Sequence, residues 1–400
     1  MRKNKRQTLL LLFGALIIVG AMTGCAQKKI QQQKYDVAAY IWPAFHNDPR
    51  WKEIGLFADG KGEWESIYKA IPKYEGHRQP RESLWGYLDE ADPATQEKAI
   101  QTALEYGVNT FIFDWYWYDG RSFLEAPLNA FLKAKGNRDM KFYLMWANHT
   151  ANSYWDRDNP DKSQVYWRGE VDRQTFDDLT DHIIKDYLTQ PNYYKIDGKP
   201  VFAIYELETF VNGMGGMEQA REALEGFRKK CLDAGLKGVH LQAILWKILS
   251  TSLDGVPASQ SATQDNALKY LGFESVTTYQ WCHYVPLQEY GAWGQEATSK
   301  YEEFSESFSV PYFAHVSVDW DNNPRFPDDM VQNAVSGVTP EKFKTFLKVA
   351  RDYCDAHPSQ VPLVTINAWN EWSEGSYLEP DTHYEYGFLE AIRDVFKTTE

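Results

Sequence analysis

The sequence predicts an α/β protein built as a single (β/α)8 TIM barrel with loop insertions. Three observations favour this fold class. Eight short apolar runs have strand character, helical patterns separate them, and the first and last runs lie near the two ends of the segment 35–400. A doubly wound sheet is the alternative, but no glycine-rich phosphate-binding loop follows any of the predicted strands.

Each predicted strand is rich in apolar, β-branched or aromatic residues, as expected for parallel strands that are buried on both faces. The predicted strands cover residues 36–42, 109–117, 141–147, 200–205, 239–245, 275–281, 312–319 and 363–369. We expect them to close into one barrel, with the last helix covering the end of the chain.

Capping residues and apolar positions at helical spacing indicate the helices between these strands. Asp92 is a typical N-cap, Pro93 suits the first helical position, and Gly107 ends the pattern. Further helices are predicted to open at Thr339-Pro340 and to cover residues 218–234 and 384–397.

Residues 1–24 have the pattern of a secretory signal peptide. Four basic residues precede a short apolar run over 9–19, which is shorter than a membrane span requires. The segment 22–25 resembles a bacterial lipobox, so we expect cleavage before Cys25 and a lipid on its sulfur; an uncleaved anchor is the alternative. The polar segment 25–34 then reads as a tether to the domain 35–400. These features predict an exported bacterial lipoprotein of the cell envelope, attached to the membrane only through its lipid.

Composition narrows the range of partners. The formal net charge is −14, and it becomes more negative when the basic leader is removed, which argues against nucleic acid and favours neutral or basic ligands. The cysteines other than Cys25 are Cys231, Cys282 and Cys354; they show no CxxC spacing, and the nine histidines show no HExxH pattern. We therefore expect no disulfide framework, no metal and no cofactor, and we expect a monomer.

Aromatic and polar residues gather at the ends of the predicted strands, where barrel enzymes carry their active sites. The candidate ligand contacts, in chain order, are Trp42, Asp114, Trp115, Tyr116, Trp117, Trp146, Asn148, His149, Tyr205, Glu206, Tyr279, Trp281, His283, Trp320, Trp369, Asn370, Trp372 and Tyr377. Flat aromatic faces can stack on sugar rings, while carboxylates and amides bind hydroxyl groups. The combination predicts a carbohydrate site; the alternative is that the tryptophans cap the core and that Asp114 and Glu206 are structural.

Two carboxylates stand out in the segment 361–381, which follows the last predicted strand. Glu371 and Glu374 are three residues apart and are framed by aromatic residues. Charged groups beside tryptophans at the end of a buried strand are costly to desolvate. Paired carboxylates are also the groups that break glycosidic bonds, one as acid and the other as base or nucleophile. The alternative is a structural role, as ion-pair partners or helix caps.

Several motifs occur together in one order along the chain. They are Glu75-Gly76-His77 with Gln79-Pro80, Trp146-Ala147-Asn148, the segment 197–201 (DGKPV), the segment 320–325 (WDNNPR) and the segment 367–375 (NAWNEWSEG). With these motifs the mature chain resembles, over essentially its whole length, the WbsX-like group, which is often labelled glycosyltransferase and is related to glycoside hydrolase family 99.

The resemblance implies a (β/α)8 barrel that acts on α-linked, possibly mannose-containing, glycans with retention of configuration. It implies that Glu371 takes the proton of the sugar's 2-hydroxyl, giving a 1,2-anhydro sugar, and that Glu374 serves as general acid and then base. The chain departs from the group after Asn148, where His149 stands in place of the usual acidic residue. Mannose specificity therefore does not carry over.

The sequence predicts a lipid-anchored glycoside hydrolase that acts on an oligo- or polysaccharide through Glu371 and Glu374. Two other functions stay open. A glycosyltransferase would need a sugar donor, and nucleotide sugars are cytoplasmic, so export speaks against it. A non-catalytic glycan-binding lipoprotein would need the aromatic ring of residues but not the acid pair.

Overall fold

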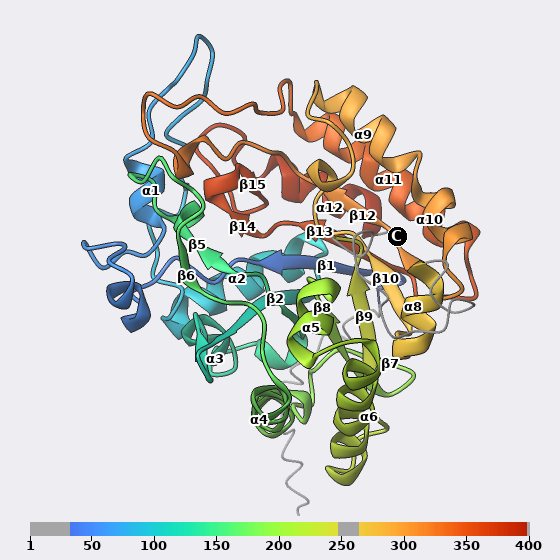
Figure 1. Cartoon of the computed structure of the whole chain (residues 1–400). Coiled ribbons are helices and arrows are strands. Elements are labelled where there is room, and N and C mark those ends of the chain that lie inside the picture. Colours follow the sequence, from blue (N-terminus) through green and yellow to red (C-terminus); the bar gives the residue numbers. More distant parts are fainter. Residues whose placement is uncertain (1–32, 247–263, 398–400) are drawn as a thin grey trace, which may run out of the picture. The chain divides into compact units, whose positions relative to one another are not determined.

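Eight parallel strands form the barrel at the centre of the domain (Figure 1), as the sequence predicts. The computed structural model describes residues 33–246 and 264–397. The barrel strands are β1 (Asp36–Ile41), β2 (Thr110–Tyr118), β4 (Lys141–Trp146), β8 (Lys199–Ile204), β9 (His240–Ile244), β10 (Ser275–Thr277), β11 (Tyr312–Phe313) with β12 (His315–Ser317), and β13 (Leu363–Asn367). Each strand pairs with its neighbours in chain order, and β1 pairs with β13.

The barrel closes because β11 and β12 act as two halves of one strand. They are separated only by Ala314, whose carbonyl oxygen accepts a hydrogen bond of 2.9 Å from the backbone N–H of Thr365. β11 pairs with β10 and β12 pairs with β13, so the seventh strand bridges its two neighbours. All nine residues of β2 are buried, as expected for a parallel strand covered on both faces.

Helices cover the outside of the barrel (Figure 1). They are α2 (Pro93–Tyr106), α3 (Ala126–Phe131), α4 (Arg173–Ile183), α5 (Leu207–Met214), α6 (Met217–Asp233), α8 (Gln264–Leu271), α9 (Tyr290–Thr298), α10 (Tyr301–Ser307), α11 (Pro340–Ala356) and α12 (Gly387–Phe396). The predicted caps are confirmed: Asp92 accepts a hydrogen bond from Ala94 N at 2.9 Å, and Thr339 caps α11. Gly107 is left-handed with φ +97°, a conformation that favours glycine.

The last helix begins three residues later than predicted. Asp381 accepts hydrogen bonds from the backbone N–H groups of His383 and Tyr384 and forms an ion pair with Arg78, which holds residues 381–386 in a turn. These side-chain contacts satisfy backbone groups outside a helix, so helical geometry starts only at Gly387.

Long insertions follow several strands on the side where the strands end. The segment after β1 contains the short helix α1 (Trp64–Tyr68), and the segment after β4 contains the hairpin β5 (Ala151–Asn152) and β6 (Val165–Trp167). Two short strands pair antiparallel with barrel strands: β3 (Arg121–Phe123) with β2, and β7 (Lys195–Ile196) with β8. After β13, the hairpin β14 (Asn370–Glu371) and β15 (Ser376–Tyr377) carries the predicted acid pair.

The predicted signal peptide, Cys25 and most of the tether lie outside the described residues. Within the described part, no helix combines the length and apolar character needed to cross a bilayer. Cys231, Cys282 and Cys354 are free thiols, and Cys231 and Cys354 are buried on α6 and α11.

Candidate active site

A cavity of about 740 Å³ lies at the carboxyl ends of the barrel strands. Every barrel strand or the loop after it contributes to its wall: from the first to the eighth, Trp42, Asp114, His149, Glu206, Trp246, Tyr279, Trp320 and Glu371. This convergence is what a closed parallel barrel produces, since all its strands end at the same rim.

The structure brings eleven of the sequence-predicted site residues to this cavity. They are Trp42, Asp114, Tyr116, His149, Tyr205, Glu206, Tyr279, His283, Trp320, Glu371 and Glu374. The two predicted catalytic glutamates therefore lie in one cavity with aromatic walls.

The remaining predicted contacts do not line this cavity. They are Trp115, Trp117, Trp146, Asn148, Trp281, Trp369, Asn370, Trp372 and Tyr377. Side chains alternate along a strand, so in β2 Asp114 and Tyr116 face the cavity while Trp115 and Trp117 point outward and stack with ring centroids 5.6 Å apart. Trp281 likewise packs outside the barrel, 5.1 Å from the ring of Trp293.

The side chains of Asn148 and Asn370 form hydrogen bonds with the backbone of residues that line the cavity. The side-chain amide of Asn370 accepts from Trp42 N and donates to Trp42 O, each at 2.8 Å. Asn148 does the same for Glu206, accepting from its N–H at 2.7 Å and donating to its carbonyl at 2.8 Å. Each amide fixes the backbone of a cavity residue, so these two asparagines are positioning residues.

One buried arginine joins the two glutamates. Arg325 Nη1 contacts Glu374 Oε1, and Nη2 lies 3.5 Å from Glu371 Oε2. The same guanidinium donates from Nε to Glu63 Oε1 at 2.7 Å. All four side chains are at least nine-tenths buried. The carboxylates are therefore held close together on one cation, which offsets part of the cost of burying them.

The hairpin geometry explains how the acids meet. Glu371 ends β14, a short turn over 372–374 follows, and Gly375 adopts φ +71° before β15 begins. A Cβ at Gly375 would lie 2.8 to 2.9 Å from the guanidinium of Arg81, so this turn needs glycine for both space and conformation.

Burial and mutual repulsion change the acidity of these groups. Burial raises the pKa of Glu371 well above that of an ordinary glutamate; Glu374 raises it further, whereas Arg325 lowers it. Burial also raises the pKa of Glu374, against the opposing effect of Arg325. Both groups are therefore able to carry a proton at a pH where an exposed glutamate would be ionised, as acid–base catalysis requires.

A tyrosine links Glu371 to a second buried acid. Tyr279 Oη lies 2.8 Å from Asp114 Oδ2 and 2.9 Å from Glu371 Oε1. Burial raises the pKa of Asp114 well above its ordinary value, and the hydrogen bond from Tyr279 opposes that rise. One phenolic hydrogen cannot serve two carboxylates, so the array accommodates one further proton.

Sequence reasoning did not assign a role to several residues of the site. Arg325 and Glu63 form the ion-pair cluster, while Tyr154, Trp155 and Trp246 line the cavity. Arg325 belongs to the WDNNPR motif, so this motif was the feature of the sequence that could have pointed to it. Among the described residues, no group of three or more His, Cys, Asp or Glu side chains is arranged to hold a metal ion.

The closed barrel and its acid-lined cavity define a protein with a glycoside hydrolase-like fold. Residues 32–392 match the family described as Glycosyltransferase WbsX, and the chain belongs to this family. The predicted family membership and barrel fold are thus confirmed.

The curated relatives are longer proteins. The chain is 26% identical over 369 residues to the uncharacterized protein WxcX of Xanthomonas campestris pv. campestris strain B100, covering 90% of this chain and 49% of that protein. The WxcX protein of strain ATCC 33913 is also 26% identical. The chain therefore spans about half the length of these relatives.

Solved structures share the fold at low identity. The GH99 endo-α-mannosidase from Bacteroides thetaiotaomicron superposes with a TM-score of 0.56 and 12% identity, over 90% of this chain and 95% of that one. A glycoside hydrolase-like protein gives a TM-score of 0.56 and 15% identity, over 92% and 95% of the two chains.

Proposed function

We propose that the protein is a glycoside hydrolase that cleaves an α-linked glycan through Glu371 and Glu374. The observation that carries this proposal is the pair itself: two buried glutamates share the guanidinium of Arg325 and line a cavity with aromatic walls. Two carboxyl groups with raised pKa values at one sugar-sized site supply the acid and base that glycoside cleavage needs.

The roles follow the resemblance to family 99. Glu371 removes the proton from the 2-hydroxyl of the sugar, whose oxygen bonds to the anomeric carbon as the glycosidic bond breaks. Glu374 protonates the departing oxygen, and afterwards it deprotonates the water whose oxygen attacks the anomeric carbon. The bond from that carbon to the 2-oxygen then breaks, and Glu371 returns its proton to the 2-oxygen. The hydrogen bond from Tyr279 favours the charged form of Glu371 and thus supports the basic role.

The family description favours a second candidate, a glycosyltransferase. Such an enzyme would form product only in the presence of an activated sugar donor. A non-catalytic glycan-binding protein is the third possibility; it would bind a glycan without consuming it, and Glu→Gln changes would leave it unaffected.

Replacing each glutamate by glutamine tests the proposal. The parent protein, Glu371→Gln and Glu374→Gln are incubated with a panel of α-linked glycans without any donor, and reducing ends are measured. Loss of an acid or base catalyst should lower turnover by about 100-fold or more. Glu379→Gln is the matched control, because Glu379 is a buried carboxylate at the end of the same hairpin that does not line the cavity.

Wild-type turnover in both glutamine variants would exclude the assigned roles. Product that forms only with a sugar donor would instead support the glycosyltransferase.

We further propose that the protein is exported and anchored through a lipid on Cys25. The lipobox-like segment 22–25 after a basic and apolar leader supports this proposal.

A further inference from the structure

A second cavity, of about 530 Å³, lies next to the first and shares a wall with it. In the shared segment after β12, Trp320 lines the first cavity while Asp319 and Asp321 line the second. The hairpin turn divides in the same way: Glu374 lines the first cavity and Gly375 the second. The volume falls in the range typical of small-molecule sites, about 300–1,000 Å³.

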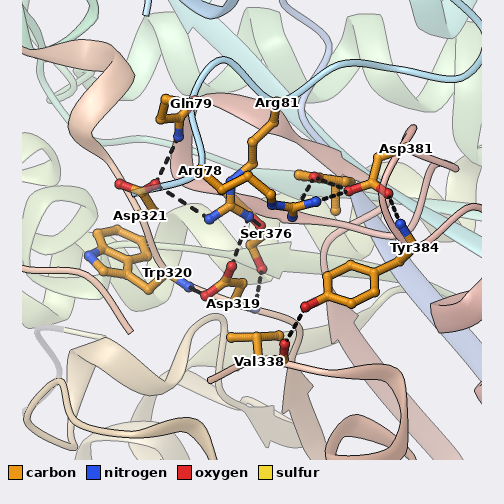
Figure 2. A network of polar contacts seen from close by, with 12 residues as sticks. Arg78, Gln79, Arg81, Asp319, Trp320, Asp321, Val338, Ser376, Asp381 and Tyr384 are labelled. Atoms are coloured by element: carbon orange, nitrogen blue, oxygen red, sulfur yellow. Dashed lines mark hydrogen bonds and ion pairs between the residues drawn. The ribbon is translucent and has the colours of Figure 1, made fainter. Parts of the chain in front are cut away.

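The acids of the second cavity are already paired. Arg81 Nη1 donates to Asp319 Oδ2 at 2.8 Å and to the carbonyl of Gly375 at 2.8 Å, and Gln79 donates to Asp321 Oδ2 at 2.8 Å (Figure 2). Burial opposes ionisation of Asp321, but hydrogen bonds from His77 and others and the charge of Arg81 lower its pKa below the ordinary value. Burial raises the pKa of Asp319, against the opposing charge of Arg81. Both carboxylates are thus already engaged by protein donors.

One donor in this wall has no partner. Arg81 Nε is buried without a hydrogen-bond acceptor, although the other two guanidinium nitrogens are engaged. Arg81 lines the cavity and is 8% exposed. A buried N–H without an acceptor carries a desolvation cost that a ligand hydroxyl could relieve.

The wall of the same cavity also contains an exposed tyrosine ring, that of Tyr74. Tyr74 lines the cavity, is 44% exposed, and stacks on His77 with ring centroids 4.3 Å apart and planes 11° apart. His77 cannot rotate freely: Nδ1 accepts from the backbone N–H of Lys73 at 3.0 Å, so Nε2 carries the hydrogen and donates to Asp321 at 2.9 Å. The exposed tyrosine ring is therefore held in place from behind.

Two further residues of the cavity wall, Arg78 and Tyr384, are held in place by their contacts. Arg78 is paired with Asp381 and its guanidinium carbon lies 5.0 Å from the centroid of the Tyr384 ring, yet a third of its side chain stays exposed. Tyr384 is fixed in turn, since its hydroxyl donates to the carbonyl of Val338 at 2.6 Å (Figure 2).

We propose that this second cavity is a separate sugar-binding site, which takes a neutral sugar unit of a glycan stacked on Tyr74 with a hydroxyl oxygen accepting from Arg81. An open aromatic face, fixed polar groups and carboxylates that already have protein partners suit a neutral polyhydroxylated ring. The choice of a glycan rests on the proposed function, whereas binding at this cavity is measurable without any cleavage.

Affinity gel electrophoresis tests the proposal. The Glu374→Gln protein, which is not expected to digest the matrix, is run through gels containing yeast α-mannan, dextran or amylopectin. We expect retardation by at least one polymer, and a Kd raised about fivefold or more when Tyr74→Ala is added. The matched control is Tyr87→Ala, because Tyr87 is 40% exposed on the same segment but does not line the cavity.

Equal retardation of the Tyr74→Ala and Tyr87→Ala proteins would overturn the proposal, as would the absence of retardation in all three gels. A second readout separates this outcome from failure of the proposed function. In an otherwise unchanged protein, Tyr74→Ala should weaken cleavage of the polymer while leaving hydrolysis of a small aryl α-glycoside unchanged, since that substrate fills only the first cavity.

Discussion

The hydrogen-bonded array of Asp114, Tyr279 and Glu371 determines which of these side chains carries a proton. If Asp114 is protonated, it donates to Tyr279 Oη, and the tyrosine hydrogen is then free to point at Glu371. The resulting hydrogen bond favours the charged form of Glu371, as a base requires, and opposes the rise in its pKa that burial causes. The other groups that face Asp114 are the buried phenols Tyr40, Tyr116 and Tyr205 and the carboxyl of Glu374, and none of them supplies a positive charge.

Two substitutions separate the roles in this array. Tyr279→Phe removes the hydrogen bond to a charged base, which is worth about 1.5–3 kcal/mol, so kcat/KM should fall by roughly 10- to 100-fold. Asp114→Asn keeps a donor toward Tyr279 and should retain activity within roughly threefold. The measurement is kcat/KM on the glycan that the panel identifies. Equal losses in the two variants would contradict the proton arrangement.

Asp114 also makes stability depend on pH. Its pKa is raised in the folded protein above the ordinary value of 3.8, so its contribution is fully present below about pH 3.8 and is lost as the pH rises toward the folded-state value. The amide of Asp114→Asn does not titrate, so the unfolding free energy of this variant should fall less steeply above pH 4. Urea unfolding followed by tryptophan fluorescence between pH 4 and 7 measures this free energy. The same change with pH in the parent and in Asp114→Asn would refute the prediction.

Single residues were predictable where local sequence carried the signal. Glu371 and Glu374 stand in an aromatic setting three residues apart, and the structure places them in one cavity. Glu63 and Arg325 are 262 residues apart in the chain, and they meet only because the loops after the first and seventh strands converge. No periodicity in the sequence encodes such a contact.

At the scale of elements, the strand ends were predictable but the direction of their side chains was not. The run Asp114 to Tyr118 is aromatic at nearly every position, so composition does not tell the inward residues from the outward ones. The pairing register decides this, and it sends Trp115 and Trp117 toward α4, where His182 lies against both rings.

The two hydrogen bonds between the side chain of Asn370, in the hairpin after β13, and the backbone of Trp42, after β1, give a prediction for these elements. Asn370→Ala leaves the N–H and carbonyl of Trp42 without their partner in a fully buried place, which should cost about 2–4 kcal/mol of unfolding free energy. Displacement of Trp42 should lower activity as well. Chemical denaturation and the glycan assay measure both effects; unchanged stability would show that the amide is not needed to hold the two segments together.

The fold of the domain was predictable because a parallel barrel repeats one pattern. All eight strands occur where apolar runs predict them, and the pairing follows chain order. The insertions were not predictable in shape, since they lack periodicity and are fixed by contacts such as those of Arg81 and Asp321 with distant loops. The second cavity lies among these insertions. Its wall includes His77, Asp321 and Tyr377 from segments noted in the sequence, but nothing in the sequence showed that these residues meet around a cavity of their own.

For the whole protein, the proposed lipid anchor on Cys25 gives a direct prediction. Cys25→Ser removes the thiol that would carry the lipid, so the protein should move from the membrane fraction to the soluble fraction of the cell envelope or to the medium. Immunoblotting of fractions, with metabolic labelling by a radioactive fatty acid, measures this. A protein that stays membrane-bound and labelled after the substitution would refute lipidation at Cys25.

A crystal structure of Glu374→Gln with the oligosaccharide that the parent cleaves tests directly whether Glu371 and Glu374 act on the bound sugar. We expect a sugar ring in the larger cavity, with its 2-hydroxyl within hydrogen-bond distance of Glu371 and the glycosidic oxygen beside residue 374. A sugar bound away from both side chains, or with its anomeric carbon out of their reach, would contradict this expectation.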